Sequence, residues 1–279
     1  MAKLRFDFKK LIPVAVAVLS ATVAMAAVTK ISFVHQADQF VRDLEMAWLA
    51  APEPQSTDIT IVTISEQTLK LFPYREPVDR KFLADLLTRL AEWKPRVIAL
   101  DVLFDEPTDP AKDDQLRSTI ADLPVPLLVS YVGDLEVVER GQGQKYLDAF
   151  VPPGDRVRAD IATDPFDGTA REVEPGYPGP DGTYIPGFAR GVLLKIGIET
   201  PAEKTTVAWR GRPDKDHEPF GQIAADSVVN FKPPVAERFL KPKITGKVVL
   251  IGADFSLTDR HRTPFARHCR RSSRSRFRA

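Results

Sequence analysis

Cysteine is almost absent from this chain, which has one, Cys269, among 279 residues. A single thiol excludes internal disulfides and any metal site built from several cysteines. Catalytic motifs are missing too: there is no Gly-x-Ser-x-Gly elbow, no phosphate loop and no His-Glu-x-x-His, and the four histidines are scattered. We therefore expect neither an enzyme nor a cofactor-binding protein.

The charges are unevenly spread, although the net charge is only +1. Residues 31–266 hold 28 Lys and Arg against 37 Asp and Glu, a balance of −9, whereas residues 267–279 hold six Arg and no acidic residue. A mildly acidic middle disfavours nucleic acid as a partner. The hydrophobic content of 43% and the length are those of a globular protein with one large domain or two small ones.

Residues 11–29 form the longest apolar stretch, in which the first eighteen residues carry no charge. A helix of that length spans ~27 Å, about the thickness of a bilayer core. Residues 1–10 carry four Lys and Arg against one Asp, which predicts a cytoplasmic basic segment. The pattern predicts a signal-anchor helix that crosses the inner (plasma) membrane once, with residues 30–279 periplasmic or extracellular. Ala24-Met25-Ala26 also fits a signal cleavage site, so a secreted form remains an alternative, as does a buried helix.

Downstream of this stretch, helical and extended patterns alternate. Helical spacing of apolar residues predicts an amphipathic stalk helix over 34–50 and further helices over 80–93, 113–123 and 188–198. Apolar, β-branched runs predict buried strands over 58–66, 96–101, 125–133, 227–231 and 247–251, and residues 141–186 are dense in turn residues. Strand, helix and strand in succession indicate an α/β fold with a mostly parallel sheet and flanking helices.

Polar residues follow three of the predicted strands, at the point where each strand ends. They are Ser65 and Glu66, Asp101 and Asp105, and Asp254 and Asp259. Open α/β sheets place ligands beyond the carboxyl ends of their strands. If the three strands are neighbours, these residues form a ligand site at one edge.

Two other interpretations of these acidic residues stay open. Asp101, Asp105 and Asp259 could serve a periplasmic metal-dependent hydrolase, because carboxylates bind cations and transfer protons. The simpler interpretation, which we favour, is that Asp101 caps the following turn while Asp105 and Glu106 are solvated.

The ordered motifs resemble the type 2 CHASE domain, the extracellular sensory domain associated with cyclases and histidine kinases. The resemblance covers about residues 30–266. It is carried by ITIVTISEQTL, RKFLADLLTRLAEWKPRV, IALDVLFDEPTDPAKDDQLRSTI, VVNFKPP and TGKVVLIGADFSLTDRHRTPF, in the expected order. The resemblance implies a sensor that binds an unidentified small-molecule or ionic signal and has no catalytic activity of its own.

The chain departs from the family pattern after residue 266. Family members continue into membrane helices and an output module, a cyclase, histidine kinase or Ser/Thr kinase. Here the sequence becomes RHCRRSSRSRFRA, a composition typical of a disordered basic tail. We interpret residues 267–279 as a frame-shifted end, so that the chain is a truncated sensor without an output domain. Such a product could bind its signal, or dimerise with itself or with a full-length relative.

Overall fold

The computed structural model describes residues 8–30, 32–74, 77–131, 142–179, 182–255 and 261–265. Its contacts divide the chain into two compact units. One unit comprises Met1–Ala50, Asp164–Thr169 and Arg262–Phe277, and the other comprises Ala51–Thr163, Ala170–His261 and Arg278–Ala279.

The first unit contains two helices, α1 (Phe8–Lys30) and α2 (Ser32–Leu49). The large apolar side chains described in α1 are exposed, from 56% for Val16 to 68% for Met25. Within the described part of the chain, no helix combines the length and the hydropathy needed to cross a membrane. The predicted membrane span over residues 11–29 is therefore not confirmed, whereas α2 confirms the predicted stalk helix as a helix.

The second unit is built on a six-stranded parallel sheet in the order β4-β3-β2-β10-β1-β9. The strands are β1 (Ser56–Ser65), β2 (Val97–Asp101), β3 (Leu127–Ser130), β4 (Arg156–Val157), β9 (Phe220–Ala224) and β10 (Val248–Asp254). The predicted α/β class with a mostly parallel sheet is confirmed. β10 is inserted between β1 and β2, which makes the last strand in sequence a central strand of the sheet.

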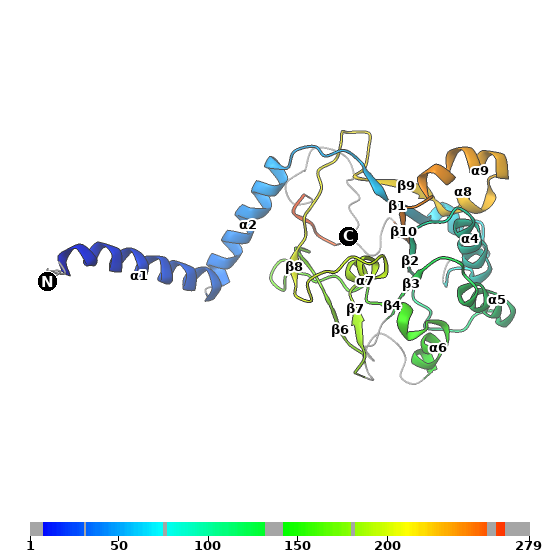
Figure 1. Ribbon diagram of the computed structural model, residues 1–279, viewed down its shortest axis with the longest axis horizontal. Helices are drawn as coiled ribbons and strands as arrows, with labels where there is room; N and C mark the ends of the chain where they lie inside the picture. Colours follow the sequence, from blue (N-terminus) through cyan, green and yellow to red (C-terminus); the bar gives the residue numbers. More distant parts are fainter. Residues whose placement is uncertain are drawn as a thin grey trace, which may run out of the picture. The chain divides into compact units, whose positions relative to one another are not determined.

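Helices cover both faces of the sheet (Figure 1). One face carries α4 (Arg80–Glu92), α5 (Pro110–Ala121), α6 (Gln142–Phe150), α8 (Ala225–Asn230) and α9 (Pro233–Phe239). The other carries α7 (Phe188–Lys195) and the hairpin of β6 (Gly176–Pro178) with β7 (Tyr184–Pro186). Smaller elements are α3 (Glu66–Leu69), η1 (Pro153–Asp155), η2 (Lys241–Lys243) and the pair β5 (Glu172–Val173) and β8 (Thr205–Thr206).

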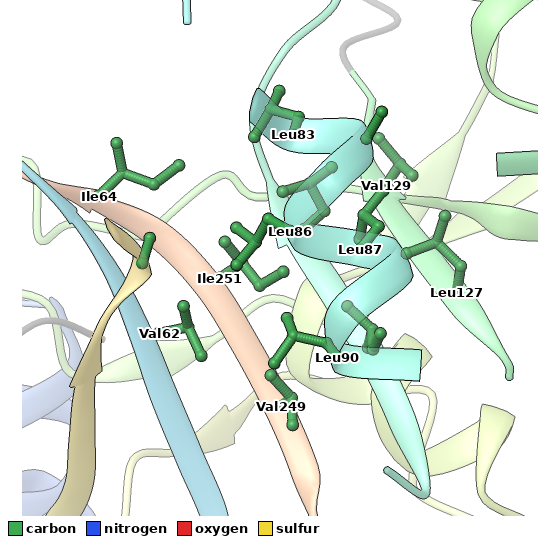
Figure 2. Close-up of a cluster of buried hydrophobic side chains, with 14 of the residues drawn as sticks. Val62, Ile64, Leu83, Leu86, Leu87, Leu90, Leu127, Val129, Val249 and Ile251 are labelled. Carbon is green, nitrogen blue, oxygen red and sulfur yellow. The ribbon is translucent and has the colours of Figure 1, made fainter. Parts of the chain in front are cut away.

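The core has two layers because successive strand residues point to opposite faces. In β2, Ile98 and Leu100 belong to the same core cluster as Leu86 and Leu87 of α4, which are fully buried. Figure 2 shows these two leucines beside Val249 and Ile251 of β10. Residues of the opposite register, such as Ala99, join the smaller cluster with α7. Burial on both faces explains why the strands read as unbroken apolar runs.

Local signals set the ends of α4 and α5. Asp79 caps α4 by accepting a hydrogen bond from the Phe82 backbone N–H at 3.0 Å, and Lys94 adopts φ 52° just past its end, before Pro95. Asp109 caps α5, which begins with Pro110 at its first position. This cap-and-proline start places the helix three residues earlier than its apolar spacing predicts.

Two predicted elements need correction. The strand predicted over 227–231 is wrong, because this stretch belongs to α8, which buries Ala225 and Val228 at helical spacing. The neighbouring strand is β9, whose sequence FGQIA lacks a continuous apolar run. The turn-dense interval 141–186 contains α6, whose sequence QGQKYLDAF has a helical apolar face.

Candidate functional site

The strand ends that carry the predicted site residues are neighbours. Ser65 pairs with Asp254 in the register of β1 and β10, and Asp101 pairs with Gly252 in the register of β10 and β2. Because all three strands are parallel, their carboxyl ends lie at one edge of the sheet. The structure therefore brings Ser65, Asp101 and Asp254 to a common edge, with Glu66 one residue beyond β1.

At β1, the Ser65 side chain is engaged in local structure. Its hydroxyl accepts a hydrogen bond from the Thr68 backbone N–H at 3.2 Å, and the Ser65 backbone N–H in turn donates to the Thr68 hydroxyl at 3.2 Å. These two hydrogen bonds form a capping box for α3. Thr68 also donates to Asp226 Oδ1 at 2.8 Å. Asp226 follows β9, so it adds a carboxylate to the same edge, one that the sequence did not single out because the preceding strand was misplaced.

Asp101 is exposed, and its Oδ1 accepts a hydrogen bond from the Ser130 hydroxyl at 2.7 Å. Ser130 ends β3, so this bond joins the ends of adjacent strands. A Cβ at Gly252 would lie 3.8 Å from the Asp101 Cβ, in ordinary van der Waals contact. Glycine at this position therefore keeps one side of Asp101 open.

The remaining predicted residues are less tightly placed. Asp105 is half-buried in the loop that follows β2, and Asp259 lies outside the described residues. No group of three or more His, Cys, Asp or Glu side chains in the described ranges has a geometry that could hold a metal ion. The metal-dependent hydrolase interpretation thus gains no support from the part of the chain that is described.

A buried ionic cluster lies between the starts of α4 and α5, and no pattern in the sequence predicts it. Arg80 is 0% exposed, and its Nε lies 3.7 Å from Oδ1 of buried Asp113. Asp113 accepts hydrogen bonds from Thr108 N at 2.9 Å and Thr108 Oγ1 at 2.6 Å. Burial alone would raise the pKa of Asp113, but the hydrogen bonds from Thr108 and Tyr146, together with the Arg80 charge, outweigh it and lower this pKa. The cluster fixes the loop that carries Asp105.

A second ion pair joins the same two helices. Lys112 Nζ lies 2.5 Å from Asp79 Oδ2, and the Tyr74 hydroxyl donates to the same oxygen at 2.8 Å. Burial acts to raise the pKa of Asp79, but hydrogen bonds from Lys112, the Phe82 N–H and Tyr74 lower it overall. The pKa of Lys112 is raised, chiefly by its hydrogen bond to Asp79.

These shifts predict a pH dependence of stability. Because the pKa of folded Asp79 lies below its unfolded value of about 3.9, ionised Asp79 stabilises the fold above that pH, and this contribution is lost as pH falls through the folded pKa. We expect Asp79→Asn, which keeps a helix cap, to be less stable than the wild type at pH 7. The difference should begin to shrink below about pH 4 and should vanish only when the pH falls below the pKa of folded Asp79. Asp79→Ala should lose a further ~1 kcal/mol at every pH, because the cap is also removed.

Urea unfolding of both variants between pH 3 and pH 8 measures this effect. A difference between Asp79→Asn and wild type that is the same at pH 3 and pH 7 would show that the ion pair does not contribute.

The chain thus contains a doubly wound α/β domain, and polar side chains lie at the carboxyl ends of its central strands, where such domains commonly bind ligands. A model of the CHASE2 domain family matches residues 16–276, and the chain belongs to that family. CHASE2 domains are extracellular sensory domains, so the chain has a sensory role in signalling and is not a member of a catalytic family.

No curated protein and no solved structure matches the chain. The family match runs beyond residue 266, where the domain was expected to end, and includes most of the basic segment 267–279. That segment lies outside the described residues, so its interpretation as a frame-shifted end stays a prediction.

Proposed function

We propose that the chain is a membrane-anchored extracytoplasmic sensor that binds its signal at the carboxyl edge of the central strands. The ligand-binding residues in this proposal are Ser65, Glu66, Asp101, Asp105, Asp254 and Asp259. The observation that carries it is the strand register, which sets Asp101, Asp254 and Ser65 on three adjacent strands. Edges of this kind are where open parallel sheets bind ligands.

The chemistry of the edge favours a ligand that is positively charged or rich in hydrogen-bond donors. Asp101, Asp254 and Asp226 place three carboxylates at the ends of neighbouring elements, and Gly252 leaves space beside the first. Carboxylates attract amines and cations, and charge-assisted hydrogen bonds to them are the stronger ones. An amine or a hydrated cation is thus the class of signal that fits this edge.

A thermal-shift experiment tests the edge. We expect one of a panel of Mg²⁺, Ca²⁺, putrescine and arginine to raise the melting temperature of the full chain, since a ligand at 100 times its Kd stabilises the native state by about 2.7 kcal/mol. Asp101→Asn should weaken this binding by about tenfold or more, because a hydrogen bond to a charged group contributes about 1.5–3 kcal/mol. Asp58→Asn is the matched control, because Asp58 is an exposed carboxylate near the other end of β1.

Equal losses in Asp58→Asn and Asp101→Asn would indicate a general charge effect, and no saturable shift with any probe would contradict an amine or cation at this edge.

The membrane anchor in this proposal is α1. Its exposed side chains are almost all apolar, and apolar surface of this extent is stable only against lipid or another apolar partner. An anchor would also let ligand binding act across the membrane. A signal that binds two conformations of the domain with different affinity shifts their populations, and this shift would move α2 and α1. Pairing with a full-length relative would supply an output module. A secreted binding protein, released by cleavage at Ala26, is the alternative.

A further inference from the structure

Helix α9 has apolar side chains on two of its faces, and the core of the domain uses only one of them. Ala236 and Leu240, the residue that follows the helix, belong to the core and are buried. Val235 and Phe239 are 42% and 56% exposed. Because residues four apart lie on the same face of a helix, α9 presents a second apolar face to solvent. The outward face of a surface helix is normally polar, so this face calls for a partner.

The segments next to α9 extend this apolar surface and surround it with positive charge. Phe231 precedes the helix and is 40% exposed. Residues 231–247 hold five Lys and Arg against one Glu, a balance of +4, within a region that is acidic as a whole. α9 lies beside α8 at the periphery of the second unit (Figure 1). Basic charge and exposed apolar side chains therefore gather at one place on the domain.

The one acidic side chain of this stretch is already engaged within the domain. Glu237 Oε1 accepts a hydrogen bond from the indole N–H of Trp93 at 2.9 Å, and its Oε2 accepts one from Lys241 Nζ at 2.7 Å. Three exposed basic side chains around it form no ion pair within the described ranges of the chain, namely Lys232, Arg238 and Lys243. Their charges are therefore available to an anionic partner.

The backbone holds these side chains in place before any partner binds. Pro233 and Pro234 occupy the first turn of α9, where the fixed φ of proline suits a helix. The short helix η2, which ends at Lys243, packs against α9. The guanidinium group of Arg238 lies 5.3 Å from the centroid of the Phe239 ring. The apolar face and its basic rim thus form a preorganised surface.

An anionic lipid surface provides what both parts of this surface need. Its headgroups attract Lys and Arg, and its acyl chains begin just below the headgroups, where Phe and Val side chains can be buried. Nucleic acid would neutralise the charges but would leave the apolar face in water. Phenylalanine next to Lys and Arg is also the combination with which amphipathic helices bind the membrane interface.

We propose that the α9 patch docks on the anionic headgroup surface of a membrane. The patch consists of Phe231, Lys232, Val235, Arg238, Phe239 and Lys243. It is separate from the acidic edge, and its role goes beyond the proposed function. Each basic residue near such a surface strengthens association by about fivefold, and this attraction is reversible and screened by salt. Docking therefore orients the sensory domain on the bilayer but does not anchor it.

Hydrogen exchange of the full chain in lipid nanodiscs tests the proposal, with one chain in each disc and either phosphatidylglycerol or phosphatidylcholine as the lipid. We expect residues 231–246 to exchange more slowly in phosphatidylglycerol than in phosphatidylcholine. This protection should be lost in about 1 M NaCl, where the Debye length falls to about 3 Å. Because α1 meets the same acyl chains in both discs, the difference reports on the α9 patch and not on a membrane anchor.

Two variants separate the apolar and the basic part of the patch. Phe239→Ser removes its most exposed apolar side chain, and Lys232→Gln combined with Lys243→Gln removes two of its charges. The double variant should shift the docking equilibrium in phosphatidylglycerol about 25-fold toward the free domain, a factor of about five for each lysine. Phe239→Ser should also reduce the protection, and circular dichroism verifies that both variants are folded.

Leu71→Ser and Lys215→Gln are the matched controls, because Leu71 is 59% exposed, Lys215 is exposed, and both lie outside the patch. Both controls should keep the protection of residues 231–246. Equal exchange of this segment in the two lipids would overturn the proposal, and so would protection that the controls lose as fully as the patch variants. Protection in both lipids that appears only with two chains in a disc would assign the surface to a second copy of the chain and would also overturn it.

Discussion

Asp113→Leu should lower the free energy of unfolding by about 3–5 kcal/mol, the cost of removing one partner from a buried ion pair. Arg80 is 0% exposed and Asp113 is 2% exposed, so water cannot replace the lost carboxylate. The substitution also removes the acceptor of both Thr108 hydrogen bonds, which hold the loop after β2. A loss of this size is a large part of the stability of an ordinary domain.

The measurement is urea unfolding of the full chain, followed by the fluorescence of buried Trp93. Asp114→Leu is the control, because Asp114 is the exposed neighbour on the same helix, and its surface ion pair with Arg117 is expected to contribute less than about 1 kcal/mol. Adding Arg80→Met to Asp113→Leu should restore most of the loss, because no uncompensated charge then remains buried. If Asp113→Leu costs no more than Asp114→Leu, the pair does not stabilise the fold.

The central strands could be predicted because of where they lie. A parallel strand covered on both faces needs apolar side chains in both registers, so VIAL and VVLI read as continuous runs. β9 is an edge strand with polar and small residues, FGQIA, and leaves no such run. The adjacent VVNF has three apolar residues out of four. A stretch this short fits a helix or a strand equally well, and in the structure it belongs to α8, which packs Val228 into the core.

The acidic edge and the buried pair of Arg80 and Asp113 differ in how far they could be foreseen. The acidic edge follows from a topological rule, since the ends of parallel strands meet, and only the neighbourhood of β1, β10 and β2 had to be established. The buried pair of Arg80 and Asp113 follows from no such rule. Arg80 starts an amphipathic helix, where an arginine is normally solvated. Arg80 is buried against Phe104 and near Tyr146 of α6, which lies 66 positions further along the chain. Such contacts between distant segments cannot be read from a single sequence.

Replacing Val18 and Leu19 together with arginine should remove the chain from the membrane fraction. An arginine near the middle of a membrane helix costs about 2.5–3.5 kcal/mol on insertion scales, and the two apolar side chains that are lost favour insertion. The total change of at least about 5 kcal/mol exceeds what residues 11–29 can offset. Both side chains are exposed, 62% and 65%, so the second unit should keep its fold.

Alkaline extraction of membranes followed by immunoblotting measures retention, and the mass of the mature chain locates its N-terminus. Phe40→Arg with Val41→Arg is the matched control, because these residues of α2 are also exposed and apolar but lie outside residues 11–29. The control should stay in the membrane fraction. A wild-type chain that is released from membranes by alkaline extraction, with a mass that begins after Ala26, would overturn the anchor and establish a secreted binding protein. A full-length mass with retention, lost only on substitution in α1, would instead establish α1 as the membrane anchor of the sensory domain.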